Sequence, residues 1–199
     1  MRNAVGALLI TAAITACSGN QTNQEIEQTM VPEAEDLSAF EAQGLEIVKS
    51  TFGVLSSALQ LRLEDGEVTD AVSYCNAAAY PLTDSLSKAH GAEIRRTSNK
   101  VRNPANALSD IEKPVFEAFL DEMNAGTEPR GKAIRMEDGM VHYFQPIFLQ
   151  PMCMNCHGVV GEQVKTEDYQ LIASLYPNDQ AVGYKPGELR GMWSITFKQ

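Results

Sequence analysis

The residues best suited to chemistry are two cysteines and a histidine in one short run, Cys153-Met154-Asn155-Cys156-His157. Two cysteines separated by two residues and followed by histidine form the attachment motif of c-type haem. Because side chains three residues apart point the same way on a helical turn, both thiols can reach one edge of the porphyrin. The motif therefore predicts one covalent haem, with thioether bonds at Cys153 and Cys156 and with His157 as the proximal ligand of the iron.

Other classes of site share part of this spacing. A thioredoxin-like redox pair, a surface disulfide and half of a zinc site all use closely spaced cysteines. Zinc would need two further Cys or His ligands, and the sequence contains no second paired cluster. A redox pair would follow a strand in a βαβ pattern and would leave His157 without a role. The motif favours haem attachment and leaves these three alternatives open.

The N-terminus has the features of an export signal. Met1-Arg2-Asn3 is a short basic segment, and residues 5–16 are small and apolar but too few to span a membrane. The small residues before Cys17 resemble the lipobox of bacterial lipoproteins, in which the cysteine is acylated and becomes the first residue of the mature chain. A plain signal peptide cleaved near Ala16 is the alternative. Because several acyl chains make a firm anchor, and because Ser18 replaces the Asp that marks inner-membrane retention by resemblance, we expect an outer-membrane anchor at Cys17, facing the periplasm.

The cysteine count bears on the haem prediction. The sequence has four cysteines. If Cys17 carries lipid and Cys153 and Cys156 carry haem, Cys75 has no partner for a disulfide. An unpaired cysteine in an exported protein needs an explanation. Cys75 is either a small buried apolar residue, which is a common fate of free cysteine, or a second ligand of the iron.

Charge and composition divide the chain and exclude some partners. The net charge is −10 at pH 7, which argues against binding to nucleic acid and against adsorption to anionic lipid. The segment that follows the leader is polar and lacks periodicity, which is typical of a flexible tether. We expect a signal peptide over 1–16, a tether over 17–32 and one haem-binding domain over 33–199.

Hydrophobic periodicity predicts a long N-terminal helix over about 33–63 and alternating strands later in the chain. This helix is expected to pack one face on its own domain, with a homodimer interface as the alternative. Pro81 is expected to interrupt the second helix or to begin a new turn, after which the helix resumes. The other predicted helices cover 70–90, 110–123 and 166–175, and the predicted strands cover 92–97, 130–136, 140–149 and 189–197. These elements predict an α+β fold, with helices flanking a small, mostly antiparallel sheet.

A basic loop over residues 95–106 is the natural partner of an anion. It carries four cations, Arg95, Arg96, Lys100 and Arg102. Such loops bind anions or pair with the protein's own carboxylates, and a solvated loop is the simpler alternative. Haem has two anionic propionates, and we expect Arg96 and Arg102, together with Lys100, to be their partners.

Several segments in the same order resemble a bacterial family of exported single-haem c-type proteins, once a domain of unknown function. Some members of that family stand alone, and others form the sensor part of histidine kinases. The resemblance extends from about Leu45 to Phe197. It rests on the Cys75 helix, on RTSNKVRNPAN at 96–106, on Cys153-x-x-Cys156-His157-Gly158, on Tyr176-Pro177, on Gly183-Tyr184 and on Gly187-Glu188-Leu189-Arg190-Gly191.

The resemblance implies a PAS-like fold that holds one covalent haem. It also implies that His157 is one axial ligand of the iron and that Cys75 is the other. Because no kinase follows Gln199, the chain resembles the stand-alone members. Considered without the family, the distal position stays open to other side chains, namely Met136, Met140, His90, His142 and Lys100.

The distal ligand decides the expected chemistry. A thiolate donates charge to iron and lowers the reduction potential, whereas methionine raises it. A thiol and a thiolate ligate with very different strength, so reduction could protonate Cys75 and release it. We therefore expect a redox or small-ligand sensor, or an accessory protein.

A monohaem electron carrier that serves a redox partner is the alternative function. An enzyme is less expected, because the sequence shows no distal His, Arg and Trp set for peroxide cleavage. A cysteine at the sixth position would also block a substrate.

Overall fold

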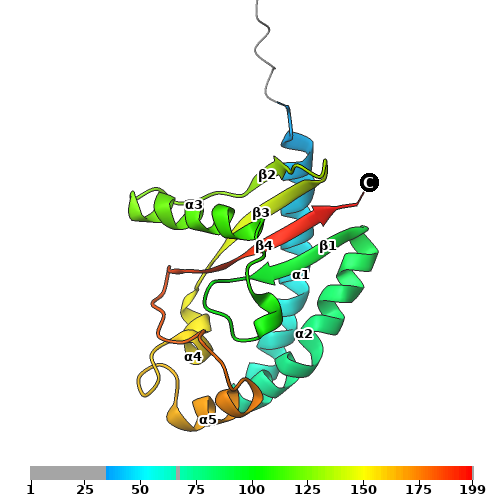
Figure 1. The fold of residues 1–199 in the computed structure, drawn as a ribbon. Helices are drawn as coiled ribbons and strands as arrows, with labels where there is room; N and C mark the ends of the chain where they lie inside the picture. Colours follow the sequence, from blue (N-terminus) through cyan, green and yellow to red (C-terminus); the bar gives the residue numbers. More distant parts are fainter. Residues whose placement is uncertain (1–34, 66–67, 199) are drawn as a thin grey trace, which may run out of the picture. The chain divides into compact units, whose positions relative to one another are not determined.

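The described residues, 35–65 and 68–198 of the computed structural model, contain four antiparallel strands in one sheet (Figure 1). The strands are β1 (Ala92–Thr97), β2 (Lys132–Arg135), β3 (Val141–Phe148) and β4 (Leu189–Phe197), in the order β1-β4-β3-β2. Ile195 of β4 lies opposite Ile94 on one side and Tyr143 on the other. The predicted α+β class and antiparallel sheet are confirmed, and β1 and β4 have the predicted bounds.

Asp36–Gln199 groups into one compact unit. The predicted signal peptide and tether, with Cys17, lie outside the described residues. No helix within 35–65 and 68–198 is long and apolar enough to cross a membrane.

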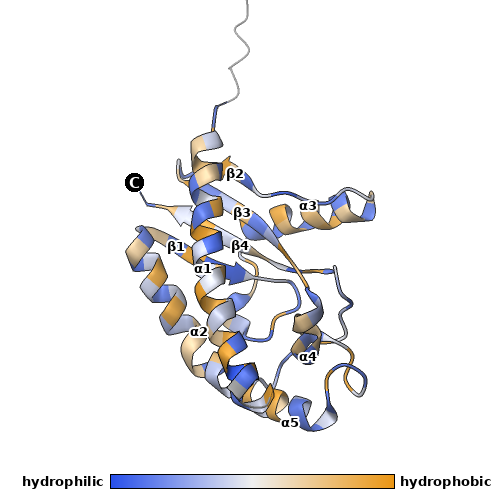
Figure 2. Ribbon diagram, turned by 180° about the vertical axis from the view of Figure 1, so that it is seen from behind, coloured by the Kyte–Doolittle hydropathy of each residue, from blue (hydrophilic) through white to orange (hydrophobic). Residues whose placement is uncertain are grey.

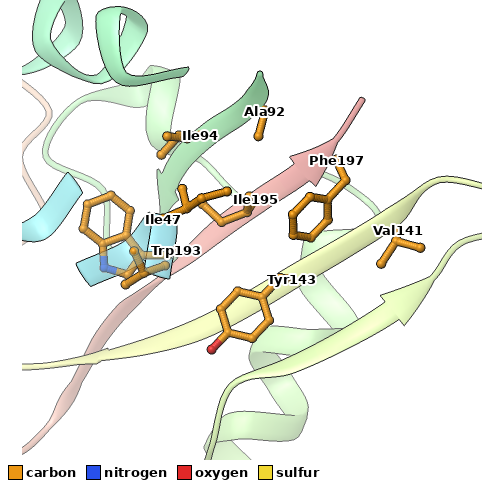
Figure 3. Packing of buried hydrophobic residues seen from close by; sticks show 9 residues of the cluster. Ile47, Ala92, Ile94, Val141, Tyr143, Trp193, Ile195 and Phe197 are labelled. Carbon is orange, nitrogen blue, oxygen red and sulfur yellow. The ribbon is translucent and has the colours of Figure 1, made fainter. Parts of the chain in front are cut away.

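Two long helices, α1 (Ser38–Asp65) and α2 (Val68–His90), cover one face of the sheet (Figures 1 and 2). Ile47 and Val48 of α1 are buried against the strands. Figure 3 shows how Ile47 lies among the strand side chains. The buried strand residues of this face are Ala92, Ile94, Val141, Tyr143, Trp193, Ile195 and Phe197. Burial of this apolar surface is the main stabilising contribution that α1 makes.

Helix α2 continues through Pro81, so of the two expectations for this residue the interruption is wrong. Proline removes one backbone N–H and so leaves the carbonyl of Ala77 without its helical donor. Both Pro81 and Ala77 are exposed, and water can therefore satisfy that carbonyl. The lost backbone hydrogen bond is therefore replaced by a bond to water, and α2 stays helical on both sides of Pro81.

Helix α3 (Glu112–Asn124) covers the opposite face of the sheet. Phe116 and Phe119 of α3 are fully buried with Phe144 of β3 and Met192 of β4. Burial on both faces explains why β3 is almost continuously buried at its N-terminal half. Carboxylate Oε2 of Glu112 accepts a hydrogen bond from the Ser109 backbone N–H at 2.8 Å, which stabilises the start of the helix.

The short elements gather beyond one end of the sheet, close to the start of α2 (Figures 1 and 2). Strand β3 leads into a short 3-10 turn, Pro151–Cys153, and then into α4 (Met154–His157). Helix α5 (Thr166–Leu175) follows and packs against α2. The fold thus places α2 beside the segment that carries the cysteine and histidine motif.

Candidate functional site

The motif occupies one helical turn at the end of β3. Cys153 ends the 3-10 turn, and Cys156 and His157 belong to α4. Both motif cysteines are half-buried and free, as is Cys75 among the described cysteines. Met154 between them is buried against Leu149 and Tyr184, which fixes the turn to the protein core. The two thiols thus have the helical spacing expected from the sequence.

The structure gives no support to the zinc alternative. In the part of the chain that is described, no group of three or more His, Cys, Asp or Glu side chains could hold a metal ion. Zinc bound by protein alone takes about four such ligands. The motif therefore lacks the further side chains that a zinc site would need.

His157 is held in one tautomer by a backbone carbonyl. Its Nδ1 lies 2.7 Å from the carbonyl oxygen of Ala181. A carbonyl only accepts hydrogen bonds, so Nδ1 must carry the proton and Nε2 keeps a free lone pair. Burial, together with the nearby cations Arg102 and Arg190, lowers the pKa of His157 well below its ordinary value. The imidazole is therefore neutral and able to ligate a metal through Nε2.

A segment late in the chain holds the motif by its backbone. Gly183 N–H donates to the Gly158 carbonyl at 2.9 Å, and Tyr184 N–H donates to the His157 carbonyl at 3.0 Å. The Tyr184 ring meets the His157 ring edge-on, with centroids 6.4 Å apart. Gly158 itself has no room for a side chain, because a Cβ would lie 2.8 Å from the Met154 carbonyl oxygen. These contacts fix the backbone on which His157 sits.

Cys75 comes to the motif from α2. It lies one helical turn after Val72, which packs in a cluster that includes Cys156. Burial raises the pKa of the Cys75 thiol, while Arg96 and Arg102 act in the opposite direction. Cys156 also has a raised pKa, caused first by burial and, among smaller effects, by charge on Cys75. The fold therefore brings Cys75 and the motif into one site, although they lie far apart in the sequence.

Arg96 is a cation without a carboxylate partner in this site. The alternation of β1 directs it to the same face as Ile94, under α2, where its guanidinium lies 5.8 Å from the centre of the Trp193 ring. Burial lowers its pKa, whereas Cys75, Tyr80 and Tyr176 raise it. Within the described residues no carboxylate forms an ion pair with it. A half-buried guanidinium without a carboxylate partner is well placed to bind an anion.

The other cations of the predicted loop have different roles. Arg95 points to the opposite face of the sheet and pairs with Glu112 at 3.5 Å. Lys100 lies 4.4 Å above the Tyr184 ring and donates to the Val182 carbonyl at 3.4 Å. Arg102 pairs with the Asp179 carboxylate at 3.1 Å. Arg102 thus pairs with one of the protein's own carboxylates, which was the alternative to binding a propionate.

Arg190 is a site residue that the sequence reasoning missed. It donates to Ser98 Oγ at 2.8 Å and to the Lys100 carbonyl at 3.0 Å, and it lies 5.6 Å from the centre of the Tyr184 ring. Burial lowers its pKa. The signal was present in the sequence, since Arg190 lies in one of the segments that carry the family resemblance. Arg190 lies outside the basic loop over residues 95–106, and only the fold brings it to Ser98 and Lys100.

The methionine and histidine candidates for the distal position lie away from the motif, whereas Lys100 lies above the Tyr184 ring that contacts His157. Met136 packs in the cluster beneath α3. His142 is buried in the sheet, where its Nδ1 lies 3.1 Å from Thr196 Oγ1. His90 ends α2 next to Ser50. The hairpin with Met136 and Met140 is at the opposite end of β3 from α4 (Figure 1).

The comparisons with known proteins agree with the class of protein that fold and site define, an α+β domain around a Cys-x-x-Cys-His turn. The chain matches the Tll0287-like family over residues 7–198 and belongs to that family. A solved structure described as the cyanobacterial haem protein Tll0287 shares the fold, with a TM-score of 0.56 and 23% identity. The match covers 84% of this chain and 97% of that chain. A search of curated proteins found no match. The predicted family and PAS-like fold are confirmed.

Proposed function

We propose that this protein binds one haem c covalently through Cys153 and Cys156, with His157 as the proximal ligand of the iron. The contact between His157 Nδ1 and the Ala181 carbonyl carries the proposal, because it leaves Nε2 free to ligate. An acceptor on the second ring nitrogen is the usual companion of a metal-bound histidine. Two free thiols on the same turn complete the attachment motif, and the related cyanobacterial protein is described as a haem protein.

Cys75 is the proposed distal ligand. Its place on α2 near Cys156 supports this assignment, as do the positions of Met136, His90 and His142 away from α4. Bound haem would supply redox chemistry, and a thiolate ligand would give it a low reduction potential. Burial favours the thiol form of Cys75, and Arg96 and Arg102 favour the thiolate. Sγ of Cys75 can therefore gain or lose a proton as the charge of the site changes.

Arg96 is the proposed partner of a haem propionate. Its guanidinium is half-buried, has no carboxylate partner among the described residues and lies near Cys75. Lys100 and Arg190 are further candidates for binding a propionate. The hydrogen bonds and ring contacts of both cations are with neutral groups, namely backbone carbonyls, the Ser98 hydroxyl and the Tyr184 ring. The Tyr184 hydroxyl is buried beside Arg190 without a hydrogen bond of good geometry, so it could also donate to an anion.

A low-potential redox or small-ligand sensor, or an accessory protein, fits this ligand set best. Proton uptake at Cys75 would release α2 from the iron, and a helix that moves with redox state is a signal. An electron-transfer cytochrome is the second candidate. Met152, 38% exposed beside half-buried Cys153, offers an apolar surface for a redox partner. We assign no catalytic residue, and we propose a lipid anchor at Cys17 that holds the protein at the outer membrane, facing the periplasm.

Spectra of wild type and Cys75→Ser test the ligand assignment. We expect the ferric wild type to give the absorption and EPR signals of a low-spin thiolate complex, and Cys75→Ser to lose them. The reduced wild type should bind carbon monoxide if Cys75 leaves the iron. Ala78→Ser, a half-buried position on the same helix, serves as the matched control and should keep the wild-type spectrum. An unchanged spectrum in Cys75→Ser would remove Cys75 from the site.

A further inference from the structure

One guanidinium joins three separate segments of the site. Nη2 of Arg102 donates to the Cys156 carbonyl at 2.6 Å, to Asp179 Oδ2 at 3.1 Å and to the Ala181 carbonyl at 3.4 Å. Nε of Arg102 donates to Asp179 Oδ1 at 3.2 Å. Arg102 thus makes a two-point ion pair with Asp179 and also contacts the backbone immediately before His157.

Asp179 completes the connection to the histidine. Its Oδ1 accepts a hydrogen bond from the Ala181 backbone N–H at 2.9 Å. The carbonyl of the same Ala181 accepts from His157 Nδ1 at 2.7 Å. The ion pair therefore fixes Ala181 at both its N–H and its carbonyl, and Ala181 in turn fixes the imidazole. The neighbouring backbone adds one more bond, from Gln180 N–H to the Val101 carbonyl at 2.9 Å.

This arrangement is buried, which makes its geometry costly to disturb. The side chain of Asp179 is 1% exposed and that of Arg102 is 15% exposed. A buried charge pair with additional hydrogen bonds resists displacement, because a charge left unpaired in the interior is strongly unfavourable. The carbonyl beneath His157 is accordingly held in place by two charged side chains, whereas most backbone carbonyls in loops are held by weaker contacts.

We propose that the Arg102–Asp179 pair is a positioning device for His157, which holds the Ala181 carbonyl against Nδ1 and so sets the orientation and donor strength of Nε2. The inference rests on the proposed function, in which His157 ligates haem iron. A firm hydrogen bond at Nδ1 raises the basicity of a metal-bound imidazole. A more basic axial ligand favours the ferric state and lowers the reduction potential. Arg102 and Asp179 thereby act on the iron through Ala181 and His157.

The charge of Arg102 alone would act in a different way. A positive charge near the iron favours the reduced state, so removing only that charge would lower the reduction potential. Loss of positioning raises the potential, because the Nδ1 hydrogen bond weakens. The double variant Arg102→Gln/Asp179→Asn removes one positive and one negative charge together. It keeps the net charge of the site and removes the ion pair that holds Ala181, together with the contact of Arg102 with the Cys156 carbonyl.

The test compares the holoprotein of wild type with this double variant and with a matched control. The control is Glu122→Gln/Lys132→Gln, which removes an ion pair of 3.0 Å between α3 and β2 without changing the net charge. Covalent haem is first measured by intact mass. Reduction potential, the spread of the ferric EPR g-values and the iron–histidine stretch in the reduced state are then compared. We expect the double variant to have a higher potential, broader EPR lines and a lower stretching frequency, with the control equal to wild type.

Each outcome separates the two proposals. A double variant that carries haem and matches the wild type in potential, EPR and stretch overturns the positioning role and leaves haem attachment intact. Wild type without covalent haem overturns the proposed function itself. If the double variant does not accumulate, the conservative variant Arg102→Lys replaces it. It keeps the charge but loses the two-point contact with Asp179, and it should raise the potential, whereas an unchanged potential contradicts the proposal.

Discussion

The neutral imidazole of His157 is the residue on which the chemistry of the site depends. The Ala181 carbonyl fixes its tautomer, and burial with nearby cations keeps it unprotonated. A histidine held in this way is able to ligate a metal, since its Nε2 lone pair is free of a proton. In the proposed site Cys75 would be the second donor to the iron, and Arg96 would be the cation that binds a propionate.

Tyr143 shows how the core responds to pH. Burial, with a smaller effect of Glu41, raises its pKa from 10.0 to about 12. Between these values the unfolded chain releases the phenolic proton and the folded protein does not. The stability that Tyr143 contributes is therefore complete below pH 10 and declines as the pH rises toward 12. Two pKa units correspond to about 2–3 kcal/mol.

The variant Tyr143→Phe should lose less stability than wild type over this pH interval. Urea unfolding at pH 8 and at pH 11.5 measures the difference. The variant is expected to be weaker at pH 8, by roughly 1 kcal/mol, because it lacks the hydrogen bond between Tyr143 and Gln145. Equal losses of stability in both proteins on going to pH 11.5 would contradict the assignment.

At the level of elements, α2 and the segment 179–184 assemble the site. Helix α2 carries Cys75 to the motif, and the segment places Asp179, Ala181 and Tyr184 against it. Helix α1 packs against both α2 and the sheet, and so supports the position of α2. The close packing of α1 depends on Gly44, where an added Cβ would overlap the Tyr143 ring.

Two alanine substitutions on α1 should have opposite effects. Gly44→Ala forces the helix away from Tyr143 and should destabilise the fold by about 1–3 kcal/mol, despite the better helix propensity of alanine. Gly53→Ala has nothing within 4 Å of the new Cβ, and it should stabilise the fold by about 0.5–1 kcal/mol. Thermal unfolding measures both changes. A stabilised Gly44→Ala would show that α1 can move away from the sheet at little cost.

The elements that the sequence predicts best are those with a local signal. Strand β4 and helix α5 follow from periodicity, and the helical turn at Cys153 follows from the motif. The contacts of Arg102 with Asp179 and Ala181 join two loops far apart in the sequence, and no periodicity encodes that meeting. The continuity of α2 at Pro81 likewise depends on which side of the helix faces water. Local pattern thus predicts the motif, whereas Arg190 and the contacts of Asp179 and Ala181 become visible only in the tertiary structure.

In the molecule as a whole, the two faces of the sheet pack against different helices and form two separate clusters of buried side chains. The face under α1 and α2 leads to the site, with Arg96 and Trp193 at its edge. The face under α3 is a core of aromatic and aliphatic side chains. In the proposed sensor of the Tll0287-like family, α3 would hold its face of the sheet rigid while α2 responds to the haem. The net charge of −10 favours solubility.

The central claim is that Cys153 and Cys156 hold one haem covalently, and the intact mass of the denatured protein tests it most directly. The protein is expressed in cells that attach c-type haem to exported chains. We expect wild type and Cys75→Ser to carry the mass of one haem, and Cys153→Ser/Cys156→Ser to carry none. A wild-type chain without that mass, or a double variant that retains it after denaturation, would contradict the account.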